Sequence, residues 1–478
     1  MAKWLSPLDA MFLYMESPDS MMHVGGLVEI EVTDGTSGDM SRRIRDELEE
    51  MTSAQAPWNL KLATPKFLKN PAHRWIEDPE FDAMYHVRRS ALPSPGGERE
   101  LGVLVSRLHS RPLDFRRPPW ECYIIEGHES GNLMMYAKVH HSLVDGYTAV
   151  KMFMRSFSDS PDAPDEPLFF QIPPAERRPK RKKRAEREAD SPADQGSFVS
   201  AVAGHMTSVR DIGKGLGRLS RSRFRKDDPI VTILQAPRSI LNGRIGRNRR
   251  FATQQYDIGR MRRIADAAGC TLNDVVLAVC GGGLRDYMQS IGALPAKPLI
   301  AFVPVNIRPK DDPGGGNMVG GMLASLGTDV ESAEERLKAV VASTTAAKKQ
   351  MEKMNRAAII GYTMYVGSPL LVQTGLAQFG LGKVFPPSFN VVISNVPGPT
   401  KPLYFRGNRL ASVYPVSFLM HGGPLNITCE SYGDTLNFGF VGCRDTLPRL
   451  QRLALACGDA VDELEKAFVA DEHHGAHI

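Results

Sequence analysis

HHSLVDG, residues 140–146, closely follows an apolar run at residues 133–137 in this chain of 478 residues. Such a run is typical of a buried β-strand, which places the two histidines at the end of that strand. Neutral imidazole, with a pKa of about 6.5, accepts and returns a proton near physiological pH. The segment therefore predicts a base at the tip of a strand. The alternative is that one or both rings are structural histidines with satisfied hydrogen bonds.

Further segments of recognisable sequence flank HHSLVDG in a fixed order along nearly the whole chain. Those before it lie at residues 5–9 (LSPLD), 22–27 (MHVGGL), 111–114 (RPLD) and 118–121 (PPWE). Those after it lie at residues 249–252 (RRFA), 272–274 (LND), 304–306 (PVN), 390–399 (NVVISNVPGP) and 425–428 (LNIT). The ordered set resembles the bacterial wax ester synthase and diacylglycerol acyltransferase family, whose signature is HHxxxDG. Pro119 departs from that pattern, since the family usually has leucine there.

The resemblance implies an α/β fold of two related domains. They would be of the chloramphenicol acetyltransferase and condensation-domain type, an α/β sandwich with an active-site tunnel at the domain interface. The sequence pattern agrees with mixed α/β order, with strands expected at residues 27–32, 134–139, 299–305, 390–394, 425–430 and 436–441 and helices at 41–51, 98–108 and 260–268. The predicted domains are residues 1–160 with HHSLVDG, a basic Pro-rich linker with an amphipathic crossover helix at 161–240, and a C-terminal domain at 241–478.

Another helix is predicted to begin at Thr271, because Asp274 three residues on forms an imperfect capping box with it. Three consecutive glycines at residues 281–283 lie within this helical pattern. A glycine run can suggest phosphate binding, but these positions lack both the GxGxxG spacing and the lysine of a P-loop. Close packing of the helix against a neighbour is the favoured interpretation.

The resemblance also implies the activity and its substrates. It implies an acyl-CoA-dependent O-acyltransferase that converts diacylglycerol to triacylglycerol, or a long-chain alcohol to a wax ester, by direct transfer. Acyl-CoA would be a co-substrate, and no bound cofactor or metal is expected. Two alternatives stay open: a condensation-domain or polyketide-associated acyltransferase that uses a carrier-protein thioester, and a non-catalytic protein of the lipid-droplet surface. The intact HHSLVDG favours an enzyme over the last of these.

Within the signature, His141 is the predicted general base and His140 is predicted to position it. In the families that the chain resembles, the aspartate at position 145 is structural: it faces away from the histidine and pairs with an arginine. Asp145 is therefore not expected to complete a catalytic triad, and Arg308 is its candidate partner. Gly146 is expected to supply a backbone conformation or a close approach that a side chain would block.

The tetrahedral oxyanion of acyl transfer needs preorganised hydrogen-bond donors. Asn273, Asn395 and a backbone amide near Gly146 are the candidates for that role. Trp120 and Asn390 are candidates either for the core or for the wall of a pocket.

The net charge of +5 depends on one short run. Seven of the eight residues at 177–184 are basic, and without them the net charge becomes −2. The run lies in a stretch rich in proline and charge, at about residues 159–195, whose composition predicts an unstructured linker. A solvated charge run is its simplest interpretation, attraction to anionic lipid is the functional alternative, and nucleic acid is not expected because no reading module accompanies the run.

Two other segments bear on membrane contact. Residues 198–219 have the spacing of a basic amphipathic helix, which either docks on the protein or lies at a membrane interface. Residues 357–382 contain no charged side chain. That length would span a bilayer, but polar residues and glycines dilute the hydropathy. We expect helices there that line an acyl pocket or touch lipid peripherally.

The six cysteines are scattered, without CxxC pairs or metal-ligand spacing, which indicates reduced thiols. Acidic residues at positions 9, 16 and 19 interrupt any signal-peptide core. We therefore expect a cytoplasmic protein, with peripheral contact to the inner membrane or to lipid bodies. Three histidines in the last six residues are treated as part of a terminal tail rather than as a metal site.

Overall fold

The computed structural model describes residues 3–33, 35–68, 72–173, 229–233, 235–306, 319–377 and 387–469. Several predicted features lie outside these residues: Arg308, the basic run at 177–184, the amphipathic helix at 198–219 and the histidines of the C-terminal tail.

The first of two six-stranded sheets carries HHSLVDG and has the strand order β12-β13-β2-β7-β6-β5. Its strands are β2 (His23–Ile30), β5 (Val87–Ala91), β6 (Trp120–Glu126), β7 (Leu133–His140), β12 (Tyr404–Phe405) and β13 (Asn408–Val416). Helix α2 (Ser37–Glu50) packs Ile44 and Leu48 against one face of this sheet. Helix α4 (Glu98–His109) packs Leu101 and Val105 against the other face, on the side of the second sheet.

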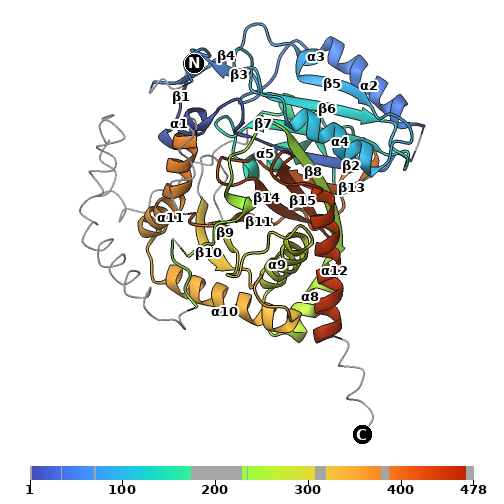
Figure 1. Ribbon diagram of the computed structural model, residues 1–478. Helices are drawn as coiled ribbons and strands as arrows, with labels where there is room; N and C mark the ends of the chain where they lie inside the picture. Colours follow the sequence, from blue (N-terminus) through green and yellow to red (C-terminus); the bar gives the residue numbers. More distant parts are fainter. Residues whose placement is uncertain are drawn as a thin grey trace, which may run out of the picture.

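The second six-stranded sheet has the order β10-β9-β11-β14-β15-β8. Its strands are β8 (Arg249–Asp257), β9 (Ile300–Asn306), β10 (Val319–Ser325), β11 (Val391–Val396), β14 (Leu425–Tyr432) and β15 (Thr435–Cys443). The helices of this half are α8 (Ile258–Ala267), α9 (Leu272–Ser290), α10 (Ala333–Glu352), α11 (Arg356–Ala377) and α12 (Leu450–Phe468). Figure 1 shows the first sheet in the upper half of the molecule and the second sheet below it, with α8, α9, α10 and α12 around the lower half.

Smaller elements complete the first half. A three-stranded sheet has the order β1-β4-β3, with β1 (Lys3–Trp4), β3 (Leu60–Leu62) and β4 (Arg74–Glu77). The remaining helices of this half are α1 (Pro7–Met15), α3 (Ala83–His86) and α5 (Gly146–Phe153).

The two halves are interlocked rather than simply joined by a linker. Strand β13 comes from the C-terminal part of the chain but pairs antiparallel with β2 of the first sheet. One hydrophobic cluster contains residues of both sheets, among them Leu27 of the first sheet and Phe251 and Val441 of the second. A domain boundary at residue 241 would therefore separate β13 from the sheet to which it belongs. The division of the chain into three segments stays a prediction.

The predicted strands and helices are present, with shifts of a few residues at their ends. The strand predicted at 134–139 is β7, the helix predicted at 98–108 is α4, and the strands predicted at 390–394 and 436–441 are β11 and β15. The capping box at Thr271 is complete, because Asp274 accepts from the Thr271 backbone and donates its own backbone N–H to Thr271 Oγ1.

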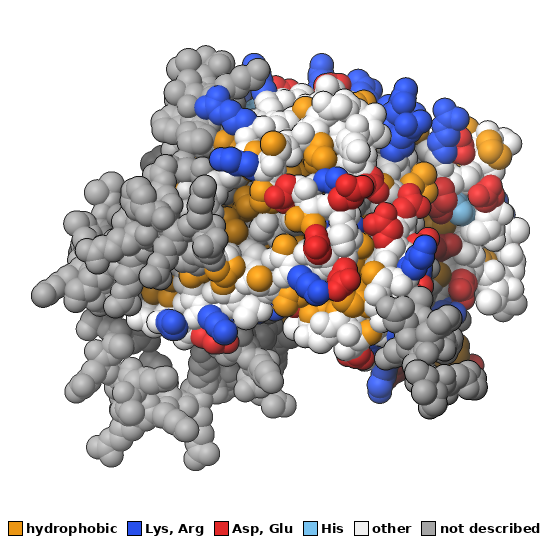
Figure 2. Space-filling model, turned by 60° about the horizontal axis from the view of Figure 1, so that its bottom comes forward, with side chains coloured by type: hydrophobic (Ala, Val, Ile, Leu, Met, Phe, Trp, Pro, Cys, Tyr) orange, Lys and Arg blue, Asp and Glu red, His pale blue; other side chains and the backbone are white. Residues whose placement is uncertain are grey.

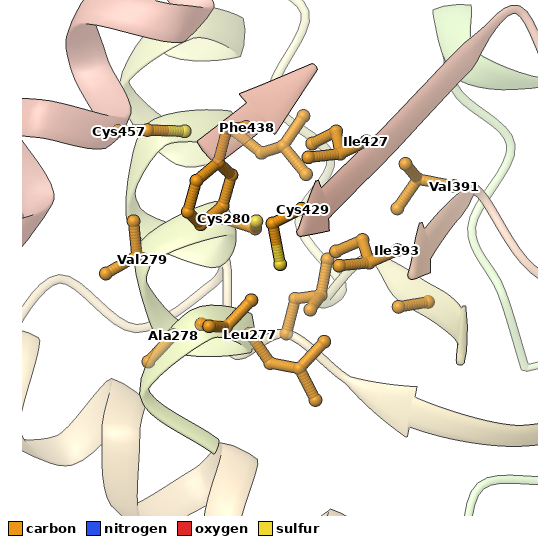
Figure 3. Packing of buried hydrophobic residues seen from close by; sticks show 14 of the residues in the cluster. Leu277, Ala278, Val279, Cys280, Val391, Ile393, Ile427, Cys429, Phe438 and Cys457 are labelled. Carbon is orange, nitrogen blue, oxygen red and sulfur yellow. The ribbon is translucent and has the colours of Figure 1, made fainter. Parts of the chain in front are cut away.

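Helix α9 forms the centre of the second half, and its glycines allow close packing as predicted. Buried side chains of α9 meet β14 and β15 around Cys280, Cys429 and Phe438 (Figure 3). A Cβ placed on Gly283 would lie 2.5 Å from Cys457 Sγ and 2.8 Å from the Cys457 backbone nitrogen on α12. One placed on Gly281 would lie 2.4 Å from the Leu326 carbonyl oxygen. The glycine run is thus a helix-packing surface.

Gly283→Ala is expected to destabilise the fold by about 1–3 kcal/mol, because the added methyl group collides with backbone as well as side-chain atoms of α12. Alanine is otherwise favoured over glycine inside a helix by roughly 0.5–1 kcal/mol. The substitution is therefore destabilising only because the collision costs more than this gain. Urea unfolding measures the difference. The control is Gly361→Ala in α11, where no atom of the described residues lies within 4 Å of an added Cβ, and where a neutral or stabilising effect is expected. Equal effects of the two substitutions would contradict the packing argument.

The uncharged segment forms one helix in its described part, α11, with Pro369 inside it. Val366 and Leu370 of α11 are buried against Leu323 and Phe389, whereas the Met364 side chain is 48% exposed. Among the described residues, no single helix is long and apolar enough to cross a membrane. Helices α8 and α9 taken together have the length and composition of a membrane span, but they are bent by 99° where they meet. On the face shown in Figure 2, acidic and basic side chains are interspersed.

Candidate active site

HHSLVDG forms the turn that connects β7 to α5. His140 is the last residue of β7 and stands opposite His23 of β2 in the antiparallel pairing. The His140 carbonyl accepts from the Leu143 N–H at 2.9 Å, which closes the turn. The His141 N–H donates to the Met22 carbonyl at 2.9 Å, which ties the turn to the start of β2. The predicted position of the histidine pair at a strand end is therefore confirmed.

The ring of His141 lies between two aromatic side chains. It is stacked on Phe12, with ring centroids 4.1 Å apart and planes at 24°, and it meets Phe418 edge-on at 5.7 Å and 83°. The Nδ1 atom is buried and accepts or donates no hydrogen bond among the described residues. Burial lowers the pKa of His141 to about 4, against the charge of Asp145, which raises the pKa. The ring is thus neutral at physiological pH.

His140 is fully buried and held by hydrogen bonds on both sides of its ring. The Ser142 backbone N–H donates to His140 Nδ1 at 3.2 Å, so this nitrogen is the acceptor and Nε2 carries the proton. His140 Nε2 then donates to Glu16 Oε2 at 3.3 Å. The same Glu16 oxygen accepts from the Met22 N–H at 2.6 Å. Glu16 and Ser142 therefore fix the orientation of His140, and the sequence had assigned neither of them to the site.

Asp145 begins α5 as its N-cap residue. Its carboxylate accepts from the Thr148 backbone N–H at 3.0 Å and from Thr148 Oγ1 at 2.8 Å. The carboxylate is thereby committed to the helix that follows the turn. The pairing with Arg308 stays a prediction, because Arg308 lies outside the described residues.

Gly146 is the first residue of α5, and its φ is not in the left-handed region. A Cβ at this position would have only Val24 Cγ2 near it, at 4.0 Å, among the described atoms. The described residues therefore show neither a left-handed φ nor a close protein contact at Gly146, and a close approach that a side chain would block stays a prediction. The space beside Gly146 is open as far as the described residues define it.

The two asparagine candidates for the oxyanion site are less closely tied to His141. Asn273 is the second residue of α9, whose main contacts are with α8, α10 and α12. Asn395 of β11 is paired with Cys429 of β14, a residue of the helix-covered core. Because paired residues share a face of a sheet, Asn395 projects toward that core. Among the described residues, no hydrogen bond joins either asparagine to His141, so their role stays a prediction.

A pair of hydroxyl groups lies closer to the aromatic contact of His141. Ser417, the neighbour of Phe418 in the chain, has its Oγ 2.9 Å from Thr428 Oγ1 of β14. Thr428 Oγ1 in turn donates to Asn426 Oδ1 at 2.9 Å. Asn426 and Thr428 alternate with the core residues Ile427 and Cys429, so they face the first sheet. The segment at 425–428 had been noted as a motif but without a role.

A buried polar cluster supports the strand that carries the histidines. Lys138 of β7 is fully buried; its Nζ donates to the Leu108 and Arg111 carbonyls at 3.0 and 2.8 Å and lies 3.3 Å from Glu121 Oε2. His109 bonds to Tyr136 Oη at 2.7 Å through Nδ1. The other nitrogen of His109 bonds to the Ser417 carbonyl at 3.0 Å. These contacts connect α4 and β7 to the segment that carries Phe418.

Trp120 and Asn390 prove to be structural. Trp120 is buried and donates its Nε1–H to the Trp58 carbonyl at 2.7 Å. Asn390 is also buried; its Nδ2 donates to the Pro237 carbonyl at 2.7 Å, and its Oδ1 accepts from the Ile300 N–H at 2.9 Å. Both side chains belong to the framework, not to the wall of a pocket. Among the described residues, no group of three or more His, Cys, Asp or Glu could hold a metal ion.

Glu16→Gln is expected to destabilise the protein by about 1–3 kcal/mol, because the neutral amide replaces the charged acceptor of the buried hydrogen bonds from Met22 and His140. Thermal or urea unfolding measures the loss. The matched control is Glu31→Gln, since the Glu31–Arg409 ion pair is exposed on both sides and pairs of that kind contribute about 0–1 kcal/mol. An effect no larger than the control would show that the Glu16 contacts do not hold His140.

Comparison with known proteins covers nearly the whole chain. The wax ester synthase/diacylglycerol acyltransferase catalytic-domain model matches residues 5–276, and the C-terminal-domain model of that family matches residues 315–465. A relative from Mycobacterium tuberculosis, named as a diacylglycerol O-acyltransferase, is 46% identical over 98% of each chain. The O-acyltransferase WSD of Acinetobacter baylyi is 36% identical, again over 98% of each chain.

Solved structures agree with this assignment. The wax ester synthase/diacylglycerol acyltransferase from Marinobacter aquaeolei VT8 is 36% identical, with a TM-score of 0.75 over 97% of this chain and 98% of that chain. The first condensation domain of the calcium-dependent antibiotic synthetase is 16% identical, with a TM-score of 0.55 over 98% of this chain and 96% of that chain, and it shows the fold alone. The predicted two-domain α/β fold of the condensation-domain type is confirmed. This chain belongs to the wax ester synthase/diacylglycerol acyltransferase family.

Proposed function

We propose that this protein is an acyl-CoA-dependent O-acyltransferase that forms triacylglycerol from diacylglycerol, and wax esters from long-chain alcohols. The observation that carries the proposal is the His141 ring, which is neutral and has no hydrogen bond to another described residue, at the β7–α5 turn. A neutral imidazole with a free nitrogen can take a proton from an alcohol. The names of the relatives support the same chemistry.

In the proposed mechanism, His141 removes the proton from the acceptor hydroxyl as its oxygen attacks the thioester carbonyl of acyl-CoA. A tetrahedral oxyanion forms, and its collapse breaks the carbon–sulfur bond. The imidazolium returns the proton to the departing thiolate, so that ester and free coenzyme A leave and the ring is neutral again. Since Nδ1 of His141 is buried, we assign the proton transfer to Nε2.

No covalent acyl-enzyme is part of this scheme. The six cysteines are free thiols, and five of them are buried. Burial raises the pKa of Cys122 to about 12, which disfavours the thiolate that a nucleophile requires. His140 would position the turn through Glu16, and Asp145 would hold the start of α5. Asn273, Asn395 and an amide near Gly146 remain the candidates for oxyanion donors.

The pH dependence of kcat/KM should have its acidic limb at about pH 4, where the base becomes protonated. Burial depresses the pKa of His141 below the ordinary value of about 6.5. The ring therefore stays neutral and able to accept a proton between about pH 4 and 6.5, and kcat/KM should be flat from about pH 5.5 to 7.5. Initial rates across this range measure the profile, and recovery of full activity at pH 7 after each incubation excludes unfolding. An acidic limb near 6.5 would contradict the depression of the His141 pKa by burial.

The reaction itself is tested with purified protein, labelled palmitoyl-CoA and either diacylglycerol or hexadecanol. We expect release of free thiol together with labelled ester. Absence of thiol release with both acceptors would overturn the proposal and leave the two alternatives. Transfer from a carrier-protein thioester but not from acyl-CoA would favour the condensation-type alternative. A cytoplasmic location, with peripheral contact to membrane or lipid bodies, completes the proposal, and the distribution of the protein between cytosol and lipid fractions checks it.

A further inference from the structure

Two phenylalanines from distant parts of the sequence enclose the ring of His141. Phe12 lies in α1, near the N-terminus, and Phe418 follows β13 in the C-terminal half. Phe12 is stacked on the imidazole at 4.1 Å, and Phe418 presents its edge at 5.7 Å. The two phenylalanine rings also meet each other at 6.1 Å and 80°. One contact fixes the plane of the imidazole, and the perpendicular contact restricts its movement within that plane.

A catalytic histidine is commonly oriented by a third group that hydrogen-bonds its second nitrogen. Here no other described residue accepts a hydrogen bond from Nδ1 of His141. The nearest acidic residue of the signature, Asp145, gives its oxygens to Thr148. The electrostatic contributions to its pKa include a hydrogen bond only with the backbone of His141 itself, so the contacts with other residues that orient the base come from packing, and the packing surface is aromatic.

We propose that Phe12 and Phe418 are positioning residues that hold the His141 ring by aromatic packing and exclude water from its Nδ1 side. The inference deepens the proposed function and rests on it, since it takes His141 as the base. It also gives α1 and the segment after β13 a shared role. Each contributes one aromatic contact to the His141 ring, so that both contacts form only when the two halves of the molecule are packed together.

Charged neighbours offer a competing explanation for the behaviour of the ring. The charges that act on His141 are those of Asp145, which favours its protonated form, and of His140, which opposes it. The other titratable groups on the packed elements have partners of their own. They include Asp9 of α1 with Ser6, Glu16 beside α1 with His140, His23 of β2 with the His109 carbonyl, Glu29 of β2 with Asn132 and Ser412, and His421 of the Phe418 segment with the Ile245 N–H, while Tyr14 of α1 meets His73. Substitution of Phe12 or Phe418 therefore changes the aromatic contacts of His141 without changing the charges around it.

Two substitutions of Phe12 separate orientation from water exclusion. Phe12→Leu keeps apolar volume but removes the flat face, and we expect kcat to fall about tenfold, with KM for palmitoyl-CoA changed less than about twofold. Phe12→Ala also uncovers the stacked face of the His141 ring, and we expect the acidic limb of kcat/KM to move from about 4 toward the ordinary value of about 6.5. Phe418→Leu removes the second aromatic contact and should lower kcat in the same direction.

The matched controls are Tyr14→Leu and Tyr14→Ala, which remove a ring from the same helix. Tyr14 is 36% exposed and its ring neighbour is His73, at 6.5 Å, not His141. These controls should leave both kcat and the pH profile as in the wild type. If Phe12→Leu and Phe418→Leu both keep the wild-type kcat, the positioning role is overturned. If Phe12→Ala leaves the acidic limb in place, water exclusion by Phe12 is overturned.

A readout without catalysis separates failure of this inference from failure of the proposed function. Diethyl pyrocarbonate carbethoxylates imidazole in its neutral form and not in its protonated form, and peptide mass spectrometry reports the rate at His141. The rate should be nearly independent of pH between 5 and 7 in the wild type, and should rise with pH in Phe12→Ala. The same pH dependence in both proteins would overturn the inference whether or not the protein transfers acyl groups.

Discussion

His141→Ala is expected to lower kcat/KM by about 10²- to 10⁴-fold, the range in which a positioned general base contributes. The ring packs between Phe12 and Phe418 and makes no hydrogen bond with the other described residues. Its removal therefore leaves an apolar gap rather than an unpaired charge, and the fold should survive. We expect the loss in kcat, with KM for acyl-CoA little changed. Initial rates of thiol release against acyl-CoA concentration make this measurement.

Rescue by imidazole is the control for this substitution. Because the missing side chain leaves a ring-sized space, added imidazole should restore part of the His141→Ala activity and should leave the wild type unaffected. Circular dichroism and a thermal unfolding curve confirm that the variant is folded. If His141→Ala retains most of its activity, the ring is not the base, and the direct-transfer mechanism fails with it.

The sequence predicted the local features of this site because they depend on neighbouring residues. The apolar run at residues 133–137 indicates a strand, and the strand begins with the run at Leu133 and ends shortly after it, at His140. Thr271 and Asp274 indicate a helix start, and both halves of the capping box are formed. Such signals act over a few residues and are readable without the fold.

The features that the sequence did not reveal depend on contacts between distant residues. Glu16 reaches His140 across 124 positions of the chain, and Phe418 reaches His141 from the other half of the molecule. The strand Asn408–Val416 joins the first sheet although it follows most of the second in sequence. No periodicity encodes these pairings. The surroundings of Gly146 are of the same kind, because only contacts with distant residues decide whether a side chain fits there.

Lys138→Met is expected to destabilise the protein by about 3–5 kcal/mol, because it leaves a buried carboxylate without its ammonium partner. The Lys138 side chain is fully buried, and its Nζ lies 3.3 Å from Glu121 Oε2 while donating to two carbonyls. Arg88 also approaches Glu121, at 3.4 Å, and Tyr123 Oη donates to it at 2.8 Å. These contacts favour the lower end of the range. Urea unfolding of the variant and the wild type measures the difference.

The matched control is Lys338→Met, because the Lys338–Glu334 pair on α10 is exposed and its loss should cost no more than about 0.5 kcal/mol. The double variant Lys138→Met/Glu121→Gln should recover part of the lost stability, since the second change removes the unpaired charge that the first creates. Lys138 stands two residues before His140 on β7, so the experiment also distinguishes a structural role of Lys138 from a role in the reaction. Activity per folded molecule should hold while stability falls. The reverse pattern, normal stability with lost activity, would place Lys138 in the reaction instead of in the framework beneath it.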